Sequence, residues 1–257
     1  MDERHARHRT SIEFDLAPMP SYEEIADWYD EWVGEPTTFA DLVVPAVIEM
    51  AGSCAGLLVC DLACGQGIAG RKLRERGARV VGVDLSMRFL EHGRRRDGGM
   101  RYVRGDARWL PLRDGAFDVV LCNMSLMDID SLERVAKEVT RVLRGGGWFF
   151  ASITHPCFQT PVSAWTEIEG RPARTVSAYF DEGFWRSAEA DSTRAAFIRG
   201  RVGAEHRRLA TYLNTFRDAG LVLDRLEEPR ASGAAAKRVP GYAETPAVLL
   251  IRWEKPR

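Results

Sequence analysis

The sequence predicts an α/β domain in which helices cover both faces of a mostly parallel sheet. Three observations lead to this prediction. Apolar, strand-like runs alternate with helical patterns from residue 57 to residue 153, as expected for parallel strands joined by helices. A glycine-rich turn containing Gly65 and Gly67 follows the first of these runs. Two later runs, 221–226 and 247–253, follow each other with only a loop between them, which indicates an antiparallel end to the sheet.

The composition favours one domain, residues 21–257, because 257 residues suit a single α/β unit with an insertion. The 36 basic residues nearly balance the 37 acidic ones, so nucleic acid is not an expected partner. No apolar run is long enough to span a membrane. The five cysteines include no C-x-x-C pair, which favours reduced thiols, a cytoplasmic location and no metal site. Residues 1–20 are predicted to be a flexible leader, since their charged start lacks the apolar core of a secretion signal.

Residues 21–50 predict an N-terminal helical cap. Ser21 is a plausible N-cap of the first helix, and Pro36 ends it. A second helix is expected over residues 39–50, where Pro45 should kink or shorten it. Aromatic and apolar residues recur every three or four positions in the first helix: Tyr22, Ile25, Trp28 or Tyr29, and Trp32.

The strand–helix alternation that follows is divided by glycine and capping residues. Gly77 ends one helix, Ser86 caps the next, and Asp130 with Glu133 forms a capping box for a third. The expected strands are 57–60, 78–83, 100–104, 117–122 and 148–153, and the expected helices are 68–76, 87–96 and 130–143.

Residues 155–203 break this pattern. The stretch is rich in aromatic residues but has little periodicity, and a long irregular insertion in a compact domain is usually functional. We expect it to act as a lid over the site. A helical stripe resumes after Glu205 and ends at Gly220.

The glycine spacing alone leaves two interpretations open. Gly65, Gly67 and Gly70 satisfy G-x-G-x-x-G, which is typical of dinucleotide-binding folds and keeps an NAD(P)-dependent oxidoreductase as an alternative. However, Asp61 ends the preceding strand, where its negative charge would face a pyrophosphate. That carboxylate is better matched to a ligand with an ammonium group, and the two consecutive terminal strands also argue against a dinucleotide fold.

Carboxylates follow three successive strands. Asp61, Asp84 and Asp106 each come at or just after a strand end, and in a doubly wound sheet such positions line one crevice. Each alone suits a turn or cap role. Their common register behind the glycine-rich loop predicts a shared ligand.

Two segments carry a family resemblance. Asp-Leu-Ala-Cys-Gly-Gln-Gly at 61–67 resembles the first motif of the class I S-adenosylmethionine (SAM) methyltransferases. Gly-Asp-Ala at 105–107, followed by Leu-Pro-Leu at 110–112 and Phe-Asp-Val-Val at 117–120, resembles their second motif. The resemblance covers about residues 55–155. It implies a Rossmann-like, seven-stranded sheet with an antiparallel last strand, SAM as cofactor, and a small-molecule acceptor.

The resemblance also implies roles for residues. Asp61, Gly65 and Gly67 would hold the methionine end, Asp84 the ribose, and Asp106 with Ala107 the adenine. Aromatic residues of the first helix would face the cationic donor. The predicted cofactor-binding residues are Tyr22, Tyr29, Asp61, Ala63, Gly65, Gly67, Asp84, Leu85, Asp106, Ala107 and Asn123.

The acceptor side is less defined. His155 and His206 are candidate general bases for an acidic acceptor, and an amine would need neither. The predicted substrate-binding residues are Trp32, His155, Phe158, Tyr179 and Trp185. The choice among O-, N- and C-methylation and the oligomeric state stay open. So does the alternative of a SAM-binding protein without catalysis.

Overall fold

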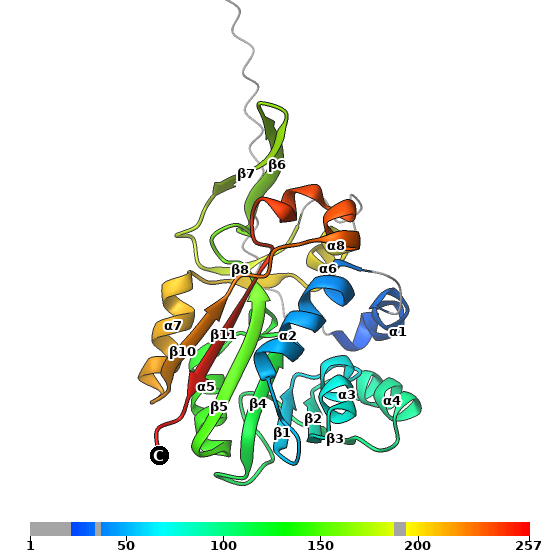
Figure 1. Ribbon diagram of the computed structural model, residues 1–257, viewed down its shortest axis with the longest axis vertical. Helices are drawn as coiled ribbons and strands as arrows, with labels where there is room; N and C mark the ends of the chain where they lie inside the picture. The colour runs from blue at the N-terminus through cyan, green and yellow to red at the C-terminus, as the bar shows by residue number, and fades with distance from the viewer. Residues whose placement is uncertain (1–21, 34–36, 188–193) are drawn as a thin grey trace, which may run out of the picture.

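The computed structural model describes residues 22–33, 37–187 and 194–257, except for the side chains of 194–196. A seven-stranded sheet in the order β10-β11-β5-β4-β1-β2-β3 forms its centre (Figure 1). The strands are β1 Leu58–Leu62, β2 Arg79–Asp84, β3 Arg101–Arg104, β4 Phe117–Asn123, β5 Leu143–Thr154, β10 Val222–Glu227 and β11 Val248–Glu254.

The sheet has the predicted direction pattern. β4, β1, β2 and β3 are parallel, and β5 is parallel to β4. β11 is antiparallel to both of its neighbours, β5 and β10. The mostly parallel sheet with an antiparallel last strand is therefore confirmed.

Successive side chains of the central strands point to opposite faces of the sheet and pack into two hydrophobic cores, one on each face. Val59 of β1 belongs to the core beneath α2 and α3, whereas Cys60 belongs to the core beneath α5 and α7. The helices are α1 Tyr22–Val33, α2 Val44–Ala51, α3 Ile68–Glu75, α4 Met87–Arg96, α5 Leu132–Val142, α6 Arg194–Arg201, α7 Leu209–Asp218 and α8 Gly233–Arg238.

The structure confirms some local predictions and corrects others. The α-helix expected over residues 39–50 is shortened as Pro45 predicted: α2 begins at Val44, with Pro45 in its first turn, and a π-helical turn occupies Phe39–Val43. Asp130 does not cap α5: the N-cap position is Ser131, without a side-chain cap bond, and the Asp130 carboxylate pairs with Arg108. Ser86 does cap α4, since its hydroxyl accepts from the N–H of Phe89. Ser21 and the leader 1–20 lie outside the described residues.

The insertion is more regular than expected. It contains a hairpin of β6 Val162–Ile168 and β7 Arg171–Ser177, which projects from the body of the molecule in Figure 1. A second antiparallel pair joins β8 Gly183–Trp185 to β9 Ala204–His206. His206 therefore lies in a strand and not at the start of a helix. None of the described helices is long and apolar enough to cross a membrane.

Candidate functional site

A cavity of about 660 Å³ lies at the carboxyl ends of the parallel strands. The turns after β1, β2, β3 and β4 form its floor, and α1 contributes Tyr22, Glu23 and Tyr29 to its wall. This is the edge at which α/β sheets bind ligands. Every predicted cofactor-binding residue lines it except Gly67. Gly67 instead takes a left-handed conformation at the start of α3, and a Cβ there would lie 2.6 Å from the Tyr102 hydroxyl.

Asp61 is the most deeply buried carboxylate of the cavity, with 1% of its surface exposed. One carboxylate oxygen accepts the Gly70 N–H at 2.9 Å, and a Cβ at Gly70 would lie 2.6 Å from that oxygen. Gly70 is thus required by Asp61, not by a pyrophosphate. Burial, with a smaller contribution from nearby Asp84, raises the pKa of Asp61 to about 7. Gly70 is the only hydrogen-bond donor to this carboxylate among the described residues, and a buried carboxylate with so few donors attracts a cationic partner.

Asp84 shapes the glycine-rich turn as well as the cavity. Its two oxygens accept the backbone N–H groups of Gly65 at 2.7 Å and Ser86 at 2.8 Å. Burial raises its pKa, while these N–H groups lower it. Each carboxylate oxygen has a second lone pair, so Asp84 can hold the loop and still accept a hydrogen bond from a ligand.

Asp106 is already paired. The guanidinium of Arg108 contacts both of its oxygens and also both oxygens of Asp130, at 2.7–3.1 Å. The Arg108 hydrogen bonds hold the pKa of Asp106 below its usual range. This end of the cavity therefore carries an ion-paired cluster, which distinguishes it from the Asp61 end.

Side-chain hydrogen bonds join the end of β4 to the ends of β1 and β5. The Ser125 hydroxyl donates to the carbonyl of Ala63 at 3.1 Å, and Ser152 donates to the amide oxygen of Asn123 at 2.6 Å. Ala63 and Met124 both have positive φ, 51° and 56°. Strained non-glycine residues of this kind concentrate at functional sites, and here both line the cavity.

An aromatic wall closes the cavity opposite the strand ends. Tyr22, Tyr29 and Phe89 line it and pack against one another with ring centroids 5.5–6.1 Å apart. Trp32 contacts Tyr29 from outside and does not line the cavity. Aromatic faces of this kind favour a cationic ligand.

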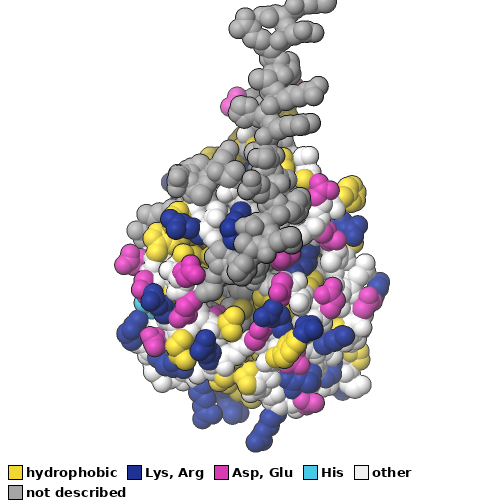
Figure 2. Space-filling model, turned by 180° about the vertical axis from the view of Figure 1, so that it is seen from behind, with side chains coloured by type: hydrophobic (Ala, Val, Ile, Leu, Met, Phe, Trp, Pro, Cys, Tyr) yellow, Lys and Arg dark blue, Asp and Glu magenta, His cyan; other side chains and the backbone are white. Residues whose placement is uncertain are grey.

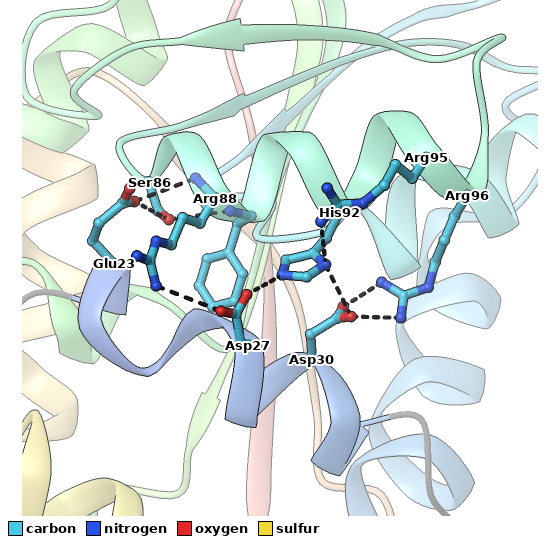
Figure 3. A network of polar contacts seen from close by, with 9 residues as sticks. Glu23, Asp27, Asp30, Ser86, Arg88, His92, Arg95 and Arg96 are labelled. Carbon is cyan, nitrogen blue, oxygen red and sulfur yellow. Dashed lines mark hydrogen bonds and ion pairs between the residues drawn. The ribbon is translucent and has the colours of Figure 1, made fainter.

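Charged contacts hold α1 against α4 (Figure 3). Glu23 accepts from Ser86, Asp27 contacts Arg88 and His92, and Asp30 pairs with Arg96 and His92. The acids lie on one side of α1, at positions three or four residues apart, as one helical face requires. They fix the helix that carries Tyr22 and Tyr29.

Known proteins share this arrangement. A family model described as "Methyltransferase domain" matches residues 60–151. A demethylmenaquinone methyltransferase of Renibacterium salmoninarum is 30% identical over 172 residues, which cover 62% of this chain and 71% of that protein. The chain belongs to the class I SAM-dependent methyltransferases.

Further relatives support the assignment. A SAM-dependent methyltransferase of Mesorhizobium loti superposes with a TM-score of 0.70 at 27% identity, over 90% of this chain and all of that one. A malonyl-[acyl-carrier protein] O-methyltransferase of Pectobacterium atrosepticum is 34% identical over 117 residues. That match covers 45% of this chain and 46% of the relative, so the chain spans less than half of the length of that protein.

The cavity of this methyltransferase fits its family's cofactor. SAM offers an ammonium group, a sulfonium, ribose hydroxyls and an uncharged purine. The cavity offers the acid Asp61, an aromatic wall, the acid Asp84 and a closely approachable backbone at Gly65. The amide nitrogen of Gln66 is buried in the lining and has no hydrogen-bond partner in the part of the chain that the structure describes, as expected where a ligand acceptor completes the site.

The residues predicted for the acceptor side lie elsewhere. His155 is buried, and its Nε2 lies 2.7 Å from a Glu228 carboxylate oxygen, while its Nδ1 accepts from the Cys157 N–H. His206 is also buried, with Nε2 3.0 Å from the carbonyl oxygen of Tyr179. Neither histidine lines the cavity, and their catalytic role stays a prediction.

The structure joins these residues to each other and not to the cavity. The His155 and Phe158 rings are 4.8 Å apart, and those of Tyr179 and His206 are 6.1 Å apart. Trp185 lies in β8, opposite Ala204. None of the predicted substrate-binding residues lines the cavity among the residues that the structure describes.

Sequence reasoning missed several lining residues. Phe89 lies on the core-facing side of α4, and Ser125 to Asp128 follow β4 in an irregular segment without a motif. Only their position directly after a predicted strand end was available as a signal. The missed lining residues include Phe39, Cys64, Gln66, Phe89, Arg108, Met124, Ser125, Asp128 and Asp130.

Proposed function

We propose that this methyltransferase moves the methyl group of SAM to a small-molecule acceptor. The observation that carries the proposal is the placement of Asp61, Asp84 and Asp106 on one cavity, at the tips of three neighbouring strands. Asp61 is buried beside the Gly70 N–H, Asp84 accepts two backbone N–H groups, and Asp106 is paired with Arg108. The three carboxylates therefore suit different parts of one ligand.

In this proposal each of the three acids binds a different part of the cofactor. Asp61 receives the ammonium group, because it is buried and has no cationic hydrogen-bond partner among the described residues. Asp84 receives the ribose hydroxyls. Asp106 and the N–H of Ala107 receive the purine edge, with Leu85 as an apolar contact.

SAM supplies an electrophilic methyl group on a sulfonium, ready for in-line displacement. The residues of the chain need only to bind, align and exclude water. Tyr22 and Tyr29 place aromatic faces at the cavity wall, which favours the cationic donor over its neutral product. Asn123 is held by Ser152 at the end of β4, where its amide can orient either reactant.

The acceptor is proposed to be small and partly apolar. Supporting this, α1 forms one wall of the cavity, and apolar residues such as Phe39, Phe89, Met124 and Ile129 are part of its lining. The relatives named above act, by their names, on a malonyl-carrier protein and on demethylmenaquinone. His155 and His206 remain candidate bases only for an acceptor that reaches beyond the cavity.

We further propose a cytoplasmic protein without a nucleic-acid partner. All five cysteines are free thiols in the structure. On the face shown in Figure 2, Lys and Arg side chains lie among Asp and Glu side chains over much of the visible surface. A nucleic-acid site would need a basic stripe.

Ligand binding tests the cofactor assignment. Isothermal titration of the full chain with SAM, S-adenosylhomocysteine (SAH), NAD and NADP should show binding of the two adenosyl compounds only. Binding of NAD or NADP without SAM would support the oxidoreductase alternative and overturn the proposal.

Transfer itself needs a second assay. The full chain is incubated with methyl-labelled SAM and fractions of a metabolite extract, with Asp61→Asn as the matched control. We expect a labelled product that requires Asp61. Binding of SAM with no labelled product in any fraction would favour a SAM-binding protein without catalysis.

A further inference from the structure

The carboxyl group of Asp128 joins three segments that are distant in the sequence. Asp128 lies in the 3-10 turn Leu126–Asp128 after β4 and lines the cavity. The Tyr22 hydroxyl of α1 lies close to it, and burial together with the Asp128 charge raises the pKa of Tyr22. The guanidinium of Arg199, from α6 of the insertion, forms an ion pair with it. One carboxylate therefore contacts the donor cavity, the N-terminal helix and the insertion.

The ion pair is largely buried. The side chains of Arg199 and Asp128 are only 18% and 12% exposed. Arg199 also donates to the carbonyl of Gly203 at 2.8 Å, which ties it to the turn before β9. Removing one partner of such a pair leaves the other charge uncompensated, so Asp128 depends on Arg199 for its position.

The turn that carries Asp128 is itself held by backbone contacts. Arg207 donates to the carbonyls of Leu126, Ile129 and Asp130 at 2.6–3.0 Å. The backbone on both sides of Asp128 is thus fixed independently of Arg199. A change at Arg199 then acts on the Asp128 side chain and on what that side chain holds.

Tyr22 is the group through which Asp128 acts on the cavity wall. Its ring lines the cavity and contacts Tyr29 and Phe89. The hydroxyl has one orientation that satisfies Asp128. An anchored hydroxyl fixes the ring, whereas a free one leaves a rotatable side chain at the start of α1.

We propose that Arg199 is a positioning residue of the donor site, acting through Asp128 on Tyr22, and that donor binding in turn orders α6. The inference rests on the proposed function. Coupling between two sites is reciprocal in free energy. If Arg199 strengthens donor binding, donor binding stabilises the position of α6 by the same free energy.

A second contact between the same helices provides a control. The Trp28 and Phe197 rings lie 4.4 Å apart, one from α1 and one from α6. Neither residue lines the cavity. Phe197→Ala therefore loosens α6 against α1 without touching the Arg199–Asp128–Tyr22 chain of contacts.

The test is SAH affinity of the full chain, measured by isothermal titration at a temperature where circular dichroism shows each variant folded. Arg199→Met keeps the apolar stem and removes the charge, and it should weaken SAH binding about five- to twenty-fold. Phe197→Ala should stay within twofold of wild type, and Arg199→Lys should recover part of the loss. Equal affinity of Arg199→Met and wild type, or an equal loss in Phe197→Ala, overturns the inference.

A double-mutant cycle separates positioning from general damage. Tyr22→Phe removes only the hydroxyl, so Arg199→Met should add little further loss in that background. Losses that simply multiply would show that Arg199 does not act through Tyr22, and would refute the proposed route.

Hydrogen exchange provides the reciprocal measurement. SAH should slow exchange of the Val202 and Gly203 amides, which bond to the carbonyls of Ile198 and Arg199, in wild type but not in Arg199→Met. If SAH protects these amides equally in both proteins, the coupling between Arg199 and the donor is refuted, whereas the proposed function is unaffected. Failure of SAH to bind wild type overturns the proposed function together with this inference.

Discussion

Asp61 and His155 both stand at or just beyond the carboxyl end of a buried parallel strand of one sheet, yet the chain surrounds them differently. After β1 a glycine-rich turn leaves Asp61 facing open space, with Gly70 making room for its carboxylate. After β5 the chain folds into a turn in which His155 itself bonds Cys157 and Glu228. A strand-end position is therefore insufficient for a role at the cavity, and the turn that follows decides.

The comparison is most sharply tested at Asp61. In Asp61→Asn the side chain keeps its shape but loses the charge that attracts an ammonium group. We expect SAM to bind about 30-fold more weakly at pH 8, or roughly 2 kcal/mol, as for a hydrogen bond to a charged group. Isothermal titration measures the change.

Asp118 supplies the matched control. It is also an aspartate beside β1, but it accepts the Leu58 N–H at the opposite end of the strand. Asp118→Asn should leave SAM affinity within about twofold. A similar loss in both variants would mean that the effect is not specific to the cavity.

The charge at Asp61 also predicts a pH dependence. Its pKa is raised from its usual value to about 7, chiefly by burial, so the group favours the folded state when protonated. That stability is fully present below about pH 4 and is lost as the pH rises through 7. Relative to Asp61→Asn, the unfolding free energy of the ligand-free wild type should fall by about 1.4 kcal/mol per pH unit between about pH 4 and 7.

Denaturant unfolding at several pH values measures this difference, which should level off above pH 7. SAM affinity should move the opposite way and weaken below pH 7, because a protonated Asp61 no longer attracts a cation. A constant difference between the two proteins would show that Asp61 stays ionised in the fold.

Substitutions in the insertion at His155 should change the free energy of unfolding and not the affinity for the donor. His155→Gln removes a buried imidazole with two partners and should cost roughly 1–3 kcal/mol of unfolding free energy. SAH affinity should stay within about twofold, because His155 does not line the cavity. Glu228→Gln keeps a hydrogen-bond acceptor for His155 and should cost less unfolding free energy. A large loss of SAH affinity in either variant would show that the turn after β5 contributes to the cavity, contrary to the comparison.

The smallest effect is expected on the outer side of α1. Asp30 is 6% exposed and pairs with Arg96, whereas Asp27 is largely exposed. Asp30→Asn should lower the unfolding free energy by about 1–2 kcal/mol, and Asp27→Asn should lower it much less, because solvent screens an exposed ion pair. Thermal unfolding at low and high salt compares them, and equal effects would argue against a selective anchor at Asp30.

The floor of the cavity could be predicted from the sequence because its signals are local. Asp61, Gly65, Asp84 and Asp106 each follow a strand within a few residues, and parallel strands bring their ends to one edge. The positive φ of Met124 has no such signal, since its residue type does not require that conformation.

The acceptor half was harder to predict because its contacts are long-range. Asp128 reaches the cavity with Arg199 and Tyr22 as partners, which lie 71 positions later and about a hundred positions earlier in the chain. Asp130 resembled a helix cap, but Arg108 offered its carboxylate a stronger partner. The aromatic content of the insertion predicted contact with the acceptor, which stays a prediction; in the structure several of those rings pack on one another.

The pairing of Arg108 with Asp106 and Asp130 has a consequence for the direction in which a ligand lies. At that end both carboxylates are paired with one shared guanidinium, which offsets one of their two negative charges, while the β1 end presents a carboxylate without a cationic hydrogen-bond partner among the described residues. A ligand with one charged and one uncharged end therefore meets a different electrostatic environment at each end of the cavity. We therefore expect a purine that carries a cationic tail to bind with the tail toward Asp61, where no other cation is hydrogen-bonded among the described residues.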